Sequence, residues 1–166
     1  EEIVRAATPT PWFQLYIFGD RRITEGLLQL ASNAGCGVLM LTVDTVVSGL
    51  RARDVRNRFR IPYRPSLRMM LDVLAHPRWL ASYLRFGAPR LANIAAPEGV
   101  DSVAARAMLL SRHMDPAVTW KTLDWIRERW NGPLVLKGIL RPSDARRACD
   151  AGVDAIVVSN HGGRQL

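Results

Sequence analysis

The sequence predicts an α/β fold in which parallel strands alternate with helices. Four short runs of apolar and β-branched residues have the length of buried strands, at residues 12–18, 38–43, 134–137 and 155–159. These runs are continuously apolar, which is typical of parallel strands covered on both faces, and helical patterns separate them. With 166 residues, 48% of them hydrophobic and 23% charged, the chain has the composition of one folded domain rather than of a disordered segment.

The connections between these strands have helical spacing. Apolar residues recur every three or four positions over residues 23–34, and Gly35 is placed to end that helix. A second apolar stripe covers residues 120–130, immediately before the third strand. A third helix is predicted to begin at Pro142, a residue favoured in the first turn, and to end at Gly152.

One connection is far longer than a crossover helix requires. About 90 residues separate the second strand from the third, which predicts an inserted segment at residues 60–115. Within it, residues 67–74 and 79–86 each form an apolar helical face with arginines between the apolar positions. Basic residues around an apolar face suit a peripheral membrane contact, predicted for residues 64–90. The alternative is that this face covers the protein body or a second subunit.

The positive charge is concentrated in the same region. The net charge is +8, and residues 51–98 hold ten arginines against three acidic residues. The segment has neither the Gly-aromatic pattern of RNA-binding domains nor a helix-turn-helix signature, so a nucleic-acid partner is not predicted. A solvated basic face is the simplest alternative to a binding surface.

Cysteine use and the termini bear on the compartment. Cys36 and Cys149 form neither a disulfide framework nor a metal-binding cluster, so a reducing, cytoplasmic compartment and no metal are predicted. No stretch of 18 uncharged apolar residues is present, and the first residues do not resemble a signal peptide. Both ends of the sequence read like cuts through a longer protein.

Polar residues end each predicted strand. They are Gln14, Tyr16, Thr42, Asp44, Lys137 and His161. Because parallel strands end at the same edge of a sheet, these side chains are expected to meet, and that edge is where β/α barrels carry out chemistry. A single polar strand end is usually a cap or a turn, but four in register that carry an acid, a base, a lysine and an arginine are hard to explain as structure alone. The glycines after His161 would let backbone approach a ligand closely.

Several motifs resemble the flavin-dependent L-2-hydroxy-acid dehydrogenases and oxidases. They are Pro-Trp-Phe-Gln-Leu-Tyr (11–16), Leu-Thr-Val-Asp-Thr (41–45), Arg-Asp-Val-Arg-Asn-Arg-Phe (53–59), Val-Leu-Lys-Gly (135–138) and Ser-Asn-His-Gly-Gly-Arg-Gln-Leu (159–166). Three further motifs resemble the mandelate and lactate dehydrogenase branch. They are His-Pro-Arg-Trp (76–79), Leu-Ala-Asn (91–93) and Ser-Arg-His-Met-Asp (111–115).

The resemblance implies that residues 1–166 are the central part of an FMN-dependent barrel. The fold would be a partial (β/α)8 TIM barrel with four of the eight strands, numbers 3 to 6. The implied reaction is oxidation of a lactate- or mandelate-like L-2-hydroxy acid to the 2-oxo acid, with a quinone or another membrane carrier as electron acceptor. A homotetramer, peripheral on the inner membrane, is also implied. The alternatives are an inactive truncated fragment and an oxidase that uses O2.

The same resemblance assigns roles to individual residues. His161 would be the catalytic base, Asp44 would orient it and stabilise the imidazolium, and Lys137 would lie near flavin N1. Three residues would bind the substrate: Tyr16 through its hydroxyl, and Arg51 and Arg164 through guanidinium groups that suit a carboxylate. The remaining cofactor-binding residues would be Gln14, Thr42 and Ser159.

Overall fold

The computed structural model describes residues 2–44, 52–57, 66–87 and 115–164. The chain divides into two compact units, one made of residues 1–50 and 113–166 and the other of residues 51–112. This division lies close to the predicted insertion at residues 60–115, whose status as an insertion stays a prediction. Each unit is described by itself.

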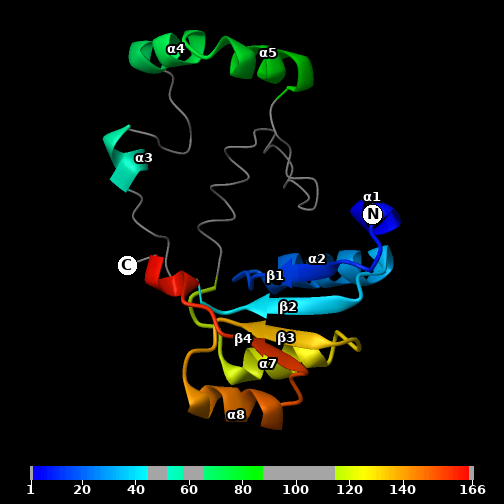
Figure 1. The fold of residues 1–166 in the computed structure, drawn as a ribbon. Helices are drawn as coiled ribbons and strands as arrows, with labels where there is room; N and C mark the ends of the chain where they lie inside the picture. Colours follow the sequence, from blue (N-terminus) through cyan, green and yellow to red (C-terminus); the bar gives the residue numbers. More distant parts are fainter. Residues whose placement is uncertain (1, 45–51, 58–65, 88–114, 165–166) are drawn as a thin grey trace. The chain divides into compact units, whose positions relative to one another are not determined.

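The first unit is built on a parallel sheet of four strands in the order β1-β2-β3-β4. The strands are β1 (Trp12–Leu15), β2 (Val38–Thr42), β3 (Leu134–Lys137) and β4 (Ala155–Val157). Every neighbouring pair is parallel, so all four carboxyl ends lie at one edge of the sheet, where the chain continues from β4 into the short helix η1 (His161–Arg164) (Figure 1). The predicted parallel α/β arrangement is confirmed.

The first strand is shorter than residues 12–18 because its last backbone groups bond elsewhere. The amide of Phe18 donates to Thr24 Oγ1 at 3.2 Å, and the carbonyl of Ile17 accepts from the amide of Asp115 at 2.9 Å. Both residues remain buried, so the apolar pattern correctly indicated burial but not pairing in the sheet.

Helices connect the strands as their periodicity predicts. These are α2 (Arg21–Ala34), α7 (Trp120–Arg127) and α8 (Pro142–Asp150), with α1 (Glu2–Ala6) before the first strand. Asp20 caps α2 by accepting from the amide of Arg22 at 3.0 Å, and Gly35 ends it in a left-handed conformation. Helix α2 packs against β1 and α8 against β4. The short helices α1 and η1 had no sequence signal strong enough to predict them.

The core of the first unit lies between the sheet and its helices. Its largest fully buried side chains include Leu15, Leu39, Leu41, Ile126 and Leu134. They come from three strands and α7, so strand and helix bury one another and the sheet edge with the polar residues is held on a packed layer.

The second unit contains α3 (Ala52–Arg56), α4 (Leu67–Leu74) and α5 (Pro77–Phe86). Ser66 caps α4, and Pro77 occupies the first turn of α5, where a proline is tolerated. Neither α4 nor α5 buries any residue. Among the described helices, none has the length and apolar character to cross a bilayer.

Candidate active site

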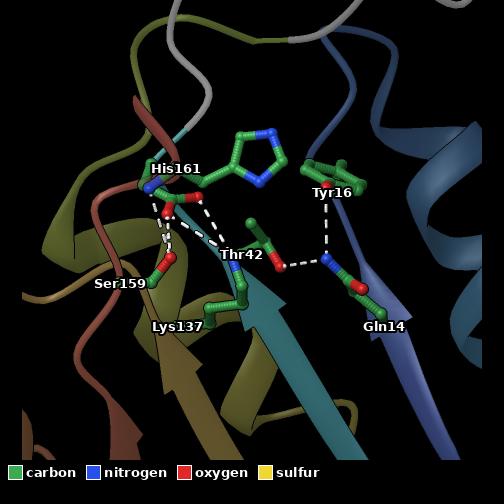
Figure 2. A network of polar contacts seen from close by, with 7 residues as sticks. Gln14, Tyr16, Thr42, Lys137, Ser159 and His161 are labelled. Atoms are coloured by element: carbon green, nitrogen blue, oxygen red, sulfur yellow. Dashed lines mark hydrogen bonds and ion pairs between the residues drawn. The ribbon is translucent and has the colours of Figure 1, made fainter. Parts of the chain in front are cut away.

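The strand register brings the predicted polar residues together at the carboxyl edge of the sheet. Thr42 at the end of β2 pairs with Lys137 at the end of β3, and Lys137 pairs with Val157 at the end of β4. Gln14 lies on the neighbouring strand β1. Figure 2 shows these side chains at the strand tips, with the rings of Tyr16 and His161 extending past them.

A first group of contacts joins β1 to β2. The side-chain amide of Gln14 donates to Thr42 Oγ1 at 2.9 Å and to Tyr16 Oη at 3.1 Å (Figure 2). Because the nitrogen makes both of these bonds, the carbonyl oxygen of Gln14 is the atom left to accept from a ligand. Thr42 is 3% exposed, so its hydroxyl is fixed in a buried position under the edge.

A second group of contacts joins β2, β3 and the segment after β4. Lys137 Nζ lies 3.3 Å from Asp44 Oδ2 and 3.5 Å from Oδ1, and the two side chains are 17% and 5% exposed. The hydroxyl of Ser159 donates to Asp44 Oδ2 at 2.8 Å. A carboxylate this buried requires partners for its charge, and here an ammonium and a hydroxyl supply them.

Gly138 makes room for that carboxylate. Its φ is +107°, and a Cβ added there would lie 2.5 Å from the Cβ of Asp44 and 2.9 Å from its backbone nitrogen. Any side chain at this position would therefore displace Asp44. The Lys-Gly pair at the end of β3 thus supplies both the cation and the space for the anion.

The structure describes the remaining predicted residues to different extents. His161 begins η1 with an exposed side chain, and its backbone amide donates to Ser159 Oγ at 3.3 Å. No hydrogen bond from the His161 ring to the Asp44 carboxylate occurs among the described contacts, so that pairing stays a prediction. Arg164 closes η1, but its side chain, like the whole of Arg51, lies outside what the structure describes.

Sequence reasoning missed two features of this site. Gly138 was noted only as part of a motif, and its close contact with Asp44 was not predicted. A glycine directly after a strand-ending lysine is nevertheless a recognisable signal for close approach of the backbone to another group. Ser159 was predicted to bind the cofactor, and its bond to a carboxylate 115 positions earlier in the chain has no local sequence signal.

Comparisons with known proteins identify the family of this chain. The model of the FMN-dependent dehydrogenase family matches residues 1–166. The chain belongs to this family. It is 41% identical to (S)-mandelate dehydrogenase of Pseudomonas putida over 166 residues and 44% identical to L-lactate dehydrogenase of Ectopseudomonas mendocina over 168 residues. All of the chain is covered, against 42% and 44% of those two relatives, so it spans less than half their length.

Solved structures in the family have the same fold. The crystal structure of the monotopic membrane protein (S)-mandelate dehydrogenase superposes with a TM-score of 0.90 at 41% identity, covering 100% of this chain and 44% of that one. Mandelate oxidase superposes with a TM-score of 0.65 at 36% identity, covering 99% and 38%. The prediction of a four-stranded portion of a (β/α)8 barrel is confirmed.

The edge of the sheet has the donors and acceptors that a flavin requires. The pyrimidine ring of a flavin presents carbonyl oxygens and an N–H group, and its reduced form carries negative charge beside N1. The carbonyl oxygen of Gln14, the hydroxyl of Thr42 and the ammonium of Lys137 lie on three adjacent strands and match those groups in kind. The residues therefore fit FMN.

Proposed function

We propose that this chain forms the catalytic core of an FMN-dependent dehydrogenase that oxidises a lactate- or mandelate-like L-2-hydroxy acid to the 2-oxo acid. The observation that carries the proposal is the polar edge of the sheet, where Lys137, Asp44 and Ser159 are in contact next to the turn that bears His161. The family membership supports the same reaction class.

Substrate binding is assigned to cations and a phenol. Arg51 and Arg164 hold the substrate carboxylate, because a guanidinium group offers paired donors in the geometry of a carboxylate. Tyr16 Oη, which already accepts from the amide of Gln14, retains its own proton to donate to the substrate.

His161 is assigned as the base. Oxidation of the hydroxy acid releases two electrons and two protons, and a neutral imidazole nitrogen of His161 accepts one of those protons. FMN, when bound, would take up the two electrons and the other proton. The exposed side chain of His161 at the start of η1 is accessible to a substrate above the sheet edge.

Lys137 and Asp44 are assigned to charge stabilisation. Gln14, Thr42, Lys137 and Ser159 hold the cofactor, with the ammonium of Lys137 favouring the reduced, negatively charged flavin. Asp44 keeps that ammonium in place and offers negative charge to a protonated His161, as an aspartate does in a catalytic triad.

The reaction is tested in a full-length hybrid in which residues 1–166 replace the matching segment of the P. putida (S)-mandelate dehydrogenase. The hybrid is expected to purify yellow, and anaerobic addition of (S)-mandelate or L-lactate is expected to bleach the flavin band. A yellow hybrid that neither acid bleaches would contradict the proposed reaction. A colourless, aggregated hybrid would instead favour the inactive fragment.

The electron acceptor is assigned as a quinone or another membrane carrier. A mandelate oxidase is among the similar structures, so O2 is the competing acceptor. Reoxidation of the bleached hybrid distinguishes them. Fast reoxidation by a water-soluble quinone with slow reoxidation by air supports a dehydrogenase, and fast reoxidation by air supports the oxidase.

A peripheral membrane contact is the second part of the proposal. Helices α4 and α5 expose large apolar side chains, among them Leu67 at 80%, Leu71 at 67%, Leu84 at 75% and Phe86 at 75%. Trp79 and Tyr83 stack at 5.3 Å between ring centroids, and such amphipathic rings favour the membrane interface. The exposed arginines 68, 78 and 85 interleave with these residues and would meet lipid headgroups.

Vesicle binding tests the membrane contact. The hybrid is expected to sediment with vesicles containing anionic lipid, less at high salt, and Leu71→Asp with Leu84→Asp is expected to release it. A double aspartate variant that still sediments would exclude α4 and α5 as the contact. Peripheral association with the inner membrane from the cytoplasm and a homotetrameric state complete the proposal.

A further inference from the structure

We propose that Ser159 is a positioning residue whose hydroxyl fixes the Asp44 carboxylate against Lys137 and ties it to the backbone of the turn that carries His161. The proposal rests on the proposed function, since it assigns Ser159 a role in that reaction beyond cofactor contact. The Ser159 hydroxyl connects two parts of the site, the Asp44–Lys137 pair and the residue assigned as the base. No other hydrogen bond between these two parts is described.

The direction of the hydrogen bonds is determined by the chemistry of the groups. A carboxylate has no proton to donate, so the 2.8 Å contact means that Ser159 Oγ donates to Asp44 Oδ2. A backbone amide can only donate, so the 3.3 Å contact means that Oγ accepts from His161. The two bonds run in one direction, from the His161 amide through the hydroxyl to the carboxylate, and such chains strengthen each member.

The distances indicate that Ser159 orients the carboxylate more than Lys137 does. The ammonium lies 3.3 and 3.5 Å from the two oxygens of Asp44. Those distances are longer than the ~2.7–2.9 Å of a strong charge-assisted hydrogen bond from nitrogen. The contact from Ser159 is shorter at 2.8 Å, so it sets which oxygen faces which partner, while the ammonium balances charge.

These two hydrogen bonds also limit the hydrogen bonds that Ser159 can make to a ligand. Its single proton is donated to Asp44 and one lone pair receives the His161 amide, so toward a cofactor the hydroxyl retains only an acceptor lone pair. Ser159 can therefore contact the cofactor without leaving Asp44. Loss of the hydroxyl would leave Lys137 as the one remaining described partner of the carboxylate and would also remove the bond to the amide of His161.

A double-mutant cycle in the FMN-loaded hybrid tests this role. Ser159→Ala is expected to slow anaerobic flavin reduction about tenfold, with KM within about twofold, because one hydrogen bond to a charged group is lost. Asp44→Ala is expected to slow it further, and Ser159→Ala is expected to add little in that background, since a residue acting through Asp44 has nothing left to position. Ser159→Thr, which keeps the hydroxyl, is expected to restore most of the rate. Ser143→Ala, at an exposed serine in α8, is the matched control.

The outcomes separate this inference from the proposed function. The positioning role is overturned if the effects of Ser159→Ala and Asp44→Ala on the reduction rate multiply in the double variant. It is also overturned if Ser159→Thr is as slow as Ser159→Ala. Neither result would count against the proposed reaction. A wild-type hybrid that no hydroxy acid reduces would refute the reaction instead. Urea unfolding of the unsubstituted hybrid, the two alanine variants and their combination then tests the contact itself: non-additive shifts in the midpoint support it, and additive shifts overturn it.

Discussion

Substitution of Gly138 by alanine tests how tightly the site is built. The φ of +107° disfavours any residue with a Cβ, a conformational cost of about 1–3 kcal/mol. The added methyl group would also lie 2.5 Å from the Cβ of Asp44, and relieving such overlap costs about 1–3 kcal/mol more. Because the backbone of Asp44 is involved as well, the overlap cannot be relieved by a side-chain rotation alone. The free energy of unfolding is expected to fall by at least about 2 kcal/mol.

Two other glycines provide controls for this substitution. Gly152 also has a positive φ, +74°, but nothing lies within 4 Å of the position that a Cβ would take there, so Gly152→Ala isolates the conformational cost. Gly26 lies inside α2 in open space, and Gly26→Ala is expected to stabilise by about 0.5–1 kcal/mol. The assay is urea unfolding of the hybrid, followed by tryptophan fluorescence, together with the flavin reduction rate. If Gly138→Ala costs no more than Gly152→Ala and leaves the rate unchanged, the close packing on Asp44 is refuted.

Three further substitutions test separate contacts. Lys137→Met leaves the buried Asp44 carboxylate without its cation and should destabilise the hybrid by about 3–5 kcal/mol in urea unfolding; a change below about 1 kcal/mol would mean that the pair is not formed. Asp154→Ala removes the acceptor of the Leu134 amide, a 2.8 Å contact, and should lower the free energy of unfolding by about 1–3 kcal/mol. Asp154→Asn keeps an acceptor oxygen and should cost less, and equal costs would show that this oxygen contributes nothing. Arg164→Lys should weaken substrate binding by about 1.5–3 kcal/mol, seen as a raised KM, and an unchanged KM would exclude Arg164 from carboxylate binding.

The parallel sheet and its connecting helices could be predicted because their signals are local. Continuous apolar runs indicated β2 and β3 nearly to the residue, and helical spacing with Gly35 indicated the end of α2. The end of β1 could not be predicted, because it depends on a hydrogen bond to Asp115, about a hundred residues further along the chain.

The site was predictable in its residue types but not in its contacts. Polar residues at strand ends indicated Gln14, Thr42 and Lys137, since parallel register alone brings them to one edge. Which partner Asp44 takes depends on where the segment after β4 passes, and that segment places the Ser159 hydroxyl 2.8 Å from the carboxylate. Long-range packing of this kind leaves no periodic trace in a sequence.

Anaerobic stopped-flow reduction of the FMN-loaded hybrid tests the central claim most directly. With (S)-mandelate or L-lactate, His161→Gln is expected to slow flavin reduction by about 10²–10⁴-fold, the usual contribution of a positioned general base. His76→Gln, the same change at an exposed histidine before α5, is expected to stay within about twofold of the unsubstituted hybrid. Reduction of His161→Gln at the unsubstituted rate would contradict the account.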